Sequence, residues 1–251
     1  MTQLACRDSH PHRAAPDRKI YVVWIALIWT VMICGFGLDL GRFRAEPAPS
    51  PLLHVHAAVY VLWLVLVSLQ IFLVEAGDIR RHRMLGWAMA ILAVGMVPLG
   101  LAAALADQAR QAGSENYTPQ FLGLEFEELI AFSAFLISGI YLRRDPAAHK
   151  RLMMLSVVAI SDAGSSRLWI VAFKLNLPGV FGWWLKYCWG VVVMLAAMAA
   201  WDIWKRRRVH PAILAGGALL LAGQWIAAEL FFSPRWNAMM IALVKAWGRS
   251  G

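Results

Sequence analysis

The chain is dominated by uninterrupted apolar runs of about twenty residues, and as helices these are long enough to cross the ~30 Å hydrocarbon core of a bilayer. Backbone groups in lipid find hydrogen-bond partners only within their own segment, so each run is predicted to be a helix. Hydrophobic residues make up 60% of the chain and charged residues 16%, which is too few to cover a soluble domain. The predicted fold class is an all-α membrane protein, a seven-transmembrane-helix bundle.

The seven predicted runs are Ile20–Leu38, Leu52–Glu75, Met84–Leu105, Phe121–Leu142, Leu152–Phe173, Trp183–Trp204 and Ala212–Phe232. The fifth run contains Asp162 and Arg167, so six helices with a re-entrant segment remain an alternative. The first run is too long for a signal-peptide core and no small-residue cleavage site follows it, so we expect a retained helix. Residues 1–19 are predicted to be a cytoplasmic polar tail, residues 20–232 the transmembrane domain, and residues 233–251 an outer C-terminal tail.

The net charge of +9 is concentrated in short connections between the runs. The basic residues of these connections and of the amino-terminal tail are Arg80, Arg81 and Arg83; Arg143, Arg144, Lys150 and Arg151; Lys205, Arg206, Arg207 and Arg208; and Arg13, Arg18 and Lys19. In a seven-helix bundle all of them fall on one side, which the positive-inside bias assigns to the cytoplasm. The N-terminus is therefore predicted inside and the C-terminus outside, with the basic residues against lipid headgroups and not nucleic acid.

Two histidines open the second run, and helix periodicity separates them. Residues two apart on a helix point in nearly opposite directions, so we expect one of His54 and His56 to be a cap or loop residue. Steps of three and four from His56 pass through Tyr60, Trp63 and Gln70, a polar and aromatic stripe predicted to face the bundle interior. His54 is predicted to lie near the outer water.

Ionisable residues from several runs fall at a similar depth near the outer side. At a rise of about 1.5 Å per residue, His56, Glu125, Glu128, Arg167 and Glu229 all lie within roughly 10 Å of the outer ends of their runs. Such groups are expensive in a membrane, so they face the interior and often mark a site.

Three interpretations of this layer stay open. Arg167 can form a structural ion pair with Glu125 or Glu128. His56, Glu125 and Glu128 can bind a divalent metal, because imidazole and carboxylate suit zinc, iron or manganese. A small polar or anionic ligand can bind Arg167, with Tyr60 and Trp63 as walls.

Asp162 lies near the middle of the fifth run, beside Gly164, Ser165 and Ser166. We expect either a protonated, hydrogen-bonded acid or a proton relay there.

The cytoplasmic side carries a second histidine layer. His82 and His149 both begin helices within a turn of the inner interface, and two imidazoles from different helices are the ligand set of b-type haem. Headgroup-level histidines with no ligand are the other interpretation. The absence of C-x-x-C-H from the sequence excludes a covalently attached c-type haem.

The chain has three cysteines. Cys34 and Cys188 both fall near outer helix ends, and we expect two separate thiols in preference to a disulfide between them. Cys6 is predicted to be cytoplasmic.

The stretches "HAAVYVLWLVLVSLQIFLVEAGDIRRHRMLGW" and "HKRLMML" resemble a family of bacterial multi-pass membrane proteins of unknown function. Its motif residues match His56, Trp63, Gln70, His82, Arg83, Leu85, Gly86, Trp87, His149, Lys150 and Arg151. The resemblance covers residues 52–167 and implies a bacterial inner-membrane location. The histidine spacing is also loosely similar to that of cytochrome b561-type membrane haem proteins, which carry two matched histidine pairs where this chain offers one.

Three classes of function follow from these residues. The first is an electron-transfer protein with haem b at His82 and His149, or a quinone-like molecule near His56, Tyr60 and Trp63. The second is a transporter or binding protein for a small polar or anionic ligand. The third is a scaffold whose polar residues specify packing. The sequence favours the first and leaves the substrate and the oligomeric state open.

Overall fold

The computed structural model describes residues 19–41, 49–174 and 176–250, and within these ranges every regular element is helical. In chain order the elements are α1 (Lys19–Leu38), α3 (Pro51–Glu75), α4 (Ile79–Gln111), the short 3-10 helix η1 (Pro119–Phe121), α5 (Leu122–Tyr141), α6 (Pro146–Ala159), α7 (Asp162–Leu168), the π-helical turn η2 (Trp169–Phe173), α8 (Gly179–Arg206), α9 (Pro211–Phe231) and α10 (Pro234–Ser250). The predicted cytoplasmic tail lies outside the described residues, except for Lys19. So do Cys6, Arg13 and Arg18.

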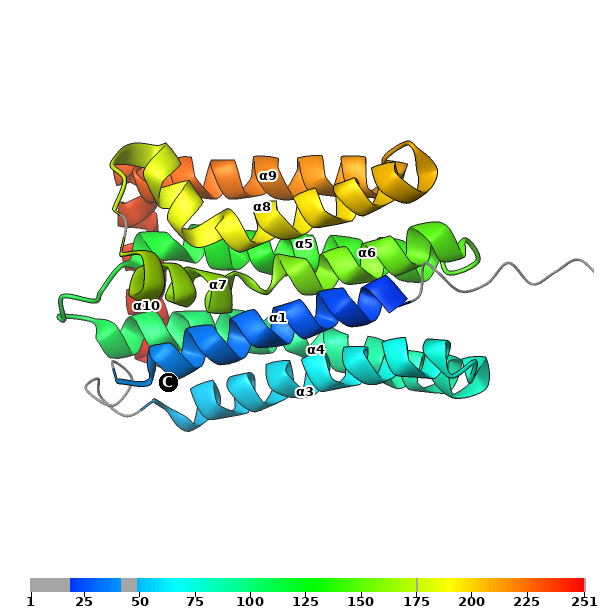
Figure 1. The fold of residues 1–251 in the computed structure, drawn as a ribbon. Coiled ribbons are helices and arrows are strands. Elements are labelled where there is room, and N and C mark those ends of the chain that lie inside the picture. The colour runs from blue at the N-terminus through cyan, green and yellow to red at the C-terminus, as the bar shows by residue number, and fades with distance from the viewer. Residues whose placement is uncertain (1–18, 42–48, 175, 251) are drawn as a thin grey trace, which may run out of the picture.

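The long helices lie side by side in one elongated bundle (Figure 1). Five of them, α1, α3, α4, α8 and α9, are long and apolar enough to cross a membrane, and α6 with α7 and η2 forms a sixth candidate bent by 51°. The helix α5 has 20 residues and lies among the others, but it carries three glutamates. The predicted all-helical, multi-pass membrane character is confirmed.

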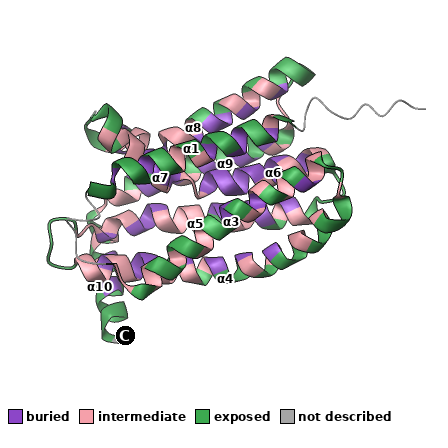
Figure 2. Ribbon diagram, turned by 60° about the horizontal axis from the view of Figure 1, so that its bottom comes forward, coloured by how far each residue is buried: buried purple, intermediate pink, exposed green. Residues whose placement is uncertain are grey.

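Large apolar side chains cover the outside of the bundle as well as its interior. Phe72, Ile91 and Ile130 are 65%, 75% and 68% exposed. Figure 2 shows exposed positions along the outward faces of the helices, while buried positions line their facing sides. A soluble protein rarely exposes apolar patches of this extent, so these faces contact lipid.

The core is centred on α5, which packs against α4, α6 and α9. Trp63 of α3 meets Phe132 of α5 edge-on, with ring centroids 5.4 Å apart. Leu155 of α6 and Met198 of α8 are also fully buried in this core. Polar groups on α5 therefore project among several neighbouring helices.

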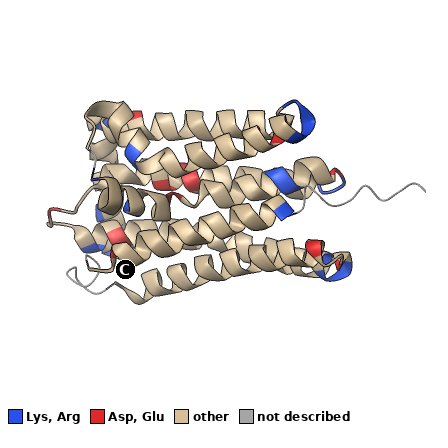
Figure 3. Cartoon of the chain, in the orientation of Figure 1, with Lys and Arg blue, Asp and Glu red and all other residues tan. Residues whose placement is uncertain are grey.

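Three turns rich in basic residues gather at one end of the bundle, which we term the basic end (Figure 3). They join α3 to α4, α5 to α6, and α8 to α9. Each following helix begins at a capping side chain: Asp78 accepts from the Arg81 N–H, Asp145 from the Ala147 N–H, and His210 Nδ1 from the Ala212 N–H. Such caps satisfy N–H groups that a helix start leaves unpaired.

The C-terminal helix α10 crosses the end of the bundle opposite the basic end (Figure 1). It packs against α4, α9 and η1, with Met240 and Val244 buried against the bundle. The apolar runs did not indicate this helix, because the segment is short and charged.

Candidate functional site

The sixth candidate span is broken next to a buried acid. The α6 helix ends at Ala159 and α7 begins at Asp162. The intervening Ser161 donates its hydroxyl to the Val158 carbonyl at 2.8 Å, and Ser165 donates to the Asp162 carbonyl at 3.2 Å. Serine and aspartate side chains compete for backbone groups in this way and weaken a continuous helix. The break places Asp162 inside the bundle at a helix start.

Asp162 takes part in a polar contact that is buried away from water. It is 1% exposed, and its partner Gln224 on α9 is fully buried. Gln224 Nε2 donates to Asp162 Oδ2 at 2.8 Å, and Ser165 Oγ lies 3.5 Å from Oδ1. Gln224 Oε1 is enclosed without a hydrogen-bond partner. The site therefore keeps one unfilled acceptor beside a buried carboxyl group.

Three glutamates of α5 are linked electrostatically to this contact, directly or through one another. Glu128 interacts electrostatically with Asp162, Glu125 and Glu127, and Asp162 also interacts with Glu127. Glu127 lies against α9, where a Cβ added to Gly223 would stand 2.7 Å from Glu127 Oε1. Acidic positions between α5 and α7 are visible inside the bundle in Figure 3. We call Glu125, Glu127, Glu128 and Asp162 the carboxylate cluster.

Within the described ranges, no lysine or arginine forms an ion pair with a member of the carboxylate cluster. Enclosed oxygens of Glu125 and Glu127 also lack hydrogen-bond partners. A bare carboxylate is very costly away from water. The cluster is stable when its charge is neutralised by bound protons or by a bound cation.

The predicted inward stripe of α3 adjoins the cluster. The His56 and Tyr60 rings stack with centroids 4.2 Å apart, Tyr60 donates its hydroxyl to the Met96 carbonyl at 3.2 Å, and Tyr60 interacts electrostatically with Glu128. His56 Nδ1 is enclosed and has no partner. The expectation that one of the two histidines is a cap or loop residue was wrong, because α3 begins at Pro51 and contains both.

Arg167 does not pair with either predicted glutamate. Its Nε lies 3.3 Å from Asp39 Oδ2, its guanidinium lies 4.4 Å from the centroid of the Phe36 ring, and it donates to the Ala163 carbonyl at 2.6 Å. Asp39, which follows α1, is the partner because α1 packs directly on α7. Arg167 acts on Glu125 and Glu128 only at longer range.

One further member of the predicted outer layer, Glu229, is exposed on α9. Across the described part of the chain, no three His, Cys, Asp or Glu side chains are grouped so as to hold a metal ion. Metal binding by His56, Glu125 and Glu128 stays a prediction. Cys34 and Cys188 are free thiols.

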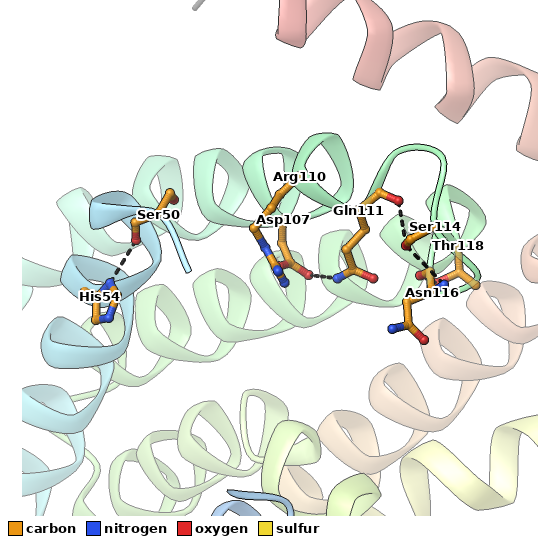
Figure 4. A network of polar contacts seen from close by, with 8 residues as sticks. All are labelled: Ser50, His54, Asp107, Arg110, Gln111, Ser114, Asn116 and Thr118. Carbon is orange, nitrogen blue, oxygen red and sulfur yellow. Dashed lines mark hydrogen bonds and ion pairs between the residues drawn. The ribbon is translucent and has the colours of Figure 1, made fainter. Parts of the chain in front are cut away.

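A network of polar contacts surrounds the ends of α3 and α4 at the α10 end of the bundle (Figure 4). Asp107 accepts from Arg110 at 2.7 Å and also from Gln111, and exposed His54 bonds the Ser50 carbonyl at 3.0 Å. Because Asp107 also interacts with Glu125, this surface network is electrostatically linked to the carboxylate cluster. His54 is exposed here, which agrees with the predicted outward direction of its side chain.

The structure brings His82 and His149 together near the basic end. Their ring centroids are 6.2 Å apart and the ring planes are nearly perpendicular. His149 Nδ1 donates to the Gly139 carbonyl at 2.8 Å, and the His82 ring lies by the backbone carbonyl of Gln70. His82 Nδ1 is enclosed without a partner. Both side chains are partly buried.

A second buried polar group at this end was not predicted. Arg151 and Asp202 are 2% and 1% exposed, and Arg151 Nε donates to Asp202 Oδ2 at 3.0 Å. The His210 N–H donates to the same carboxylate at 3.0 Å.

Burial, with the nearby Arg151 and Arg206, holds the pKa of His210 below its ordinary value, so its ring is neutral at pH 7. The N–H groups of Ala148 and Ala147 lower the pKa of Asp145.

Sequence reasoning missed four members of these sites: Glu127, Asp39, Gln224 and Asp202. Glu127 was visible as a third acid in an apolar run, but it lies on a different helix face from the pair at 125 and 128. Asp39 and Asp202 stand at run ends, where a charge needs no special explanation. Comparison of the chain with models of protein families, with curated proteins and with solved structures finds no match.

Proposed function

We propose that the protein is a multi-pass inner-membrane carrier that binds and releases protons at the carboxylate cluster as it moves a small polar solute. The observation that carries this proposal is the break between α6 and α7, which sets buried Asp162 against Gln224 among three glutamates. Broken helices inside a membrane are a recurring feature of solute and ion sites in transporters. The location in the bacterial inner membrane rests on the motif resemblance and on the basic end.

The topology that fits this proposal has seven crossings. The helix α5 has 20 residues and an outward face with exposed Ile130 and Ile137, so we infer that it crosses together with the six other candidates. The basic end then faces the cytoplasm and α10 lies on the outer surface.

The carboxyl groups supply the chemistry. Asp162 and Glu128 hold protons when the site is closed, because an ionised pair would stay uncompensated in a medium of low dielectric constant. Opening toward water lets one of them ionise. Arg167 is engaged by Asp39, which disfavours an anionic solute and favours one that is neutral or cationic.

Replacing Asp162 with Asn is the test of this proposal. Infrared difference spectroscopy of the purified protein across a pH titration should show a protonated carboxyl band in the wild type, and the variant should lose a large part of it. Proteoliposomes with an internal pH dye should show proton entry under an imposed potential, falling by about tenfold or more in the variant, the loss typical of removing a proton-transfer group.

Asp145→Asn is the matched control, because it makes the same chemical change at an exposed helix cap where Asn also caps well. It should leave both signals unchanged. Equal spectra for wild type and Asp162→Asn would overturn the proton site. An altered spectrum with no proton entry in the wild type would remove proton movement driven by the potential alone and leave a proton-binding site.

A second candidate function, electron transfer, is favoured by the contact between His82 and His149. The two ring centroids are 6.2 Å apart, a separation at which both imidazoles would reach one metal ion held between them. Metal-bound histidines usually anchor their other nitrogen on a carbonyl, as His149 does on Gly139. His82 and His149 would hold a bound haem b, which would supply one-electron chemistry.

Absorption spectra of the purified protein, oxidised and reduced, decide this candidate. A Soret band that disappears in both His82→Ala and His149→Ala is the expected result, with exposed His54→Ala as the control. A colourless wild-type protein would exclude haem at this pair, leaving the carrier proposal untouched. The predicted quinone-like ligand beside His56, Tyr60 and Trp63 stays a prediction.

A further inference from the structure

A cavity of about 350 Å³ lies at the basic end, in the turn between α8 and α9. It is lined by Arg206, Arg208, Val209, His210 and Pro211. Its volume falls at the lower end of the range of about 300–1,000 Å³ that small-ligand sites occupy. It is separate from the carboxylate cluster, which lies on α5 and α7.

The conformation of the turn places arginine side chains around this cavity. Arg207 ends α8 in the left-handed region, with φ 59°, and its N–H closes the helix on the Ile203 carbonyl. The chain then turns so that Arg206 and Arg208 both line the cavity while Arg207 does not. The cavity also adjoins the start of the 21-residue helix α9, where the helix dipole favours an anion.

His210 can donate a hydrogen bond into this environment. Its Nδ1 accepts the Ala212 N–H at 3.1 Å, so the proton of the neutral ring is on Nε2. The acid facing this turn from α8 is Asp202, which is 1% exposed and already bound by Arg151 and the His210 N–H. Asp145, across the turn, is held by the N–H groups of α6. Arg208 is exposed, so its guanidinium is accessible to an external anion.

Apolar surface beside the cavity indicates a lipid ligand. Ile203 and Leu214 are 51% and 60% exposed on the two helices that flank it. Trp204 is also exposed, with Lys205 Nζ 4.0 Å from its ring centroid. Exposed tryptophan next to lysine is typical of the headgroup level of a membrane. A ligand with a phosphate in the cavity can lay its acyl chains along these faces.

We propose that this cavity binds the phosphate group of an anionic phospholipid, with Arg206 and Arg208 contacting its oxygens and His210 Nε2–H donating a hydrogen bond. Basic pockets between membrane helices bind phospholipid headgroups in this way. Arginine suits the role because its fork of donors matches phosphate geometry.

Native mass spectrometry of the full chain, with dioleoyl phosphatidylglycerol, dioleoyl phosphatidylcholine or inorganic phosphate added, tests the proposal. We expect retained phosphatidylglycerol in the wild type and about tenfold weaker retention in Arg208→Gln, the scale expected for losing a charge-assisted hydrogen bond. Arg207→Gln is the matched control, with the same charge change one residue away, and should behave as wild type. Thermal unfolding confirms that both variants are folded.

Three outcomes would overturn the proposal. Equal losses in Arg207→Gln and Arg208→Gln would mean that binding of phosphatidylglycerol depends on the overall charge of the turn and not on the cavity. Equal retention of phosphatidylcholine would mean that no anion is selected. Displacement of phosphatidylglycerol by millimolar inorganic phosphate would assign the cavity to free phosphate.

Discussion

Replacing Asp202 with Ala is expected to destabilise the protein by about 3–5 kcal/mol, the range found when one partner of a buried ion pair is removed. The variant removes the carboxylate that faces the Arg151 guanidinium, which is 2% exposed. Arg151 also donates to the Ala147 carbonyl at 2.8 Å, but a neutral carbonyl does not replace the lost carboxylate. The His210 N–H loses its acceptor as well, so the turn into α9 loosens. Thermal unfolding in detergent measures the loss.

The double variant Arg151→Met with Asp202→Leu is the control for this prediction. It removes both charges and keeps apolar volume, and such replacements are often close to neutral. We expect it to recover most of the stability that Asp202→Ala loses. If Asp202→Ala unfolds within about 0.5 kcal/mol of wild type, as ordinary surface changes do, the ion pair has no structural role.

The second large effect is expected at Gly35, where α1 touches α7. A Cβ added there would lie 2.1 Å from the Gly164 carbonyl oxygen and 3.1 Å from its Cα. Both are backbone atoms that no rotamer change can move. Gly35→Ala should therefore force the two helices apart and destabilise the fold by about 1–3 kcal/mol, as overpacking does. Because α7 begins at Asp162, proton binding at the carboxylate cluster should weaken too.

Gly37→Ala is the matched control two residues further along α1, where an added Cβ meets nothing within 4 Å. It should be neutral or slightly stabilising, since alanine favours a helix over glycine by up to about 1 kcal/mol. Similar unfolding temperatures for the two variants would contradict the close contact between α1 and α7.

Membrane class and helical segments were predictable from the sequence, because the length of an apolar run and the need to satisfy backbone groups leave few alternatives. The inward face of α3 was also predictable, since a 3.6-residue period fixes which residues share a side. Buried Trp63 and half-buried His56, against exposed His54, show this. The helix α10 was missed because its longest apolar run, residues 238–244, is too short to cross a membrane.

The partners of the buried charges were not predictable, because depth along a helix says nothing about which neighbour it faces. Arg167 and Glu128 stand at similar depths, yet Arg167 turns to Asp39 at the end of α1. The sequence predicts Arg151 at the level of the lipid headgroups, in a basic turn. In the structure it is buried against α8, which begins 28 residues later in the chain (179 minus 151). Both errors come from the unknown packing order of the helices.

The ion pair between Asp39 and Arg167 also has a consequence for how the chain is made. The two residues are 128 positions apart (167 minus 39), and at about 5–20 residues per second the ribosome separates their synthesis by roughly 6 to 26 seconds. During that interval α1 is already made, with the Gly35 surface uncovered and Asp39 without its arginine. The nascent first helix is therefore an exposed intermediate that insertion factors or lipid shield until α7 emerges.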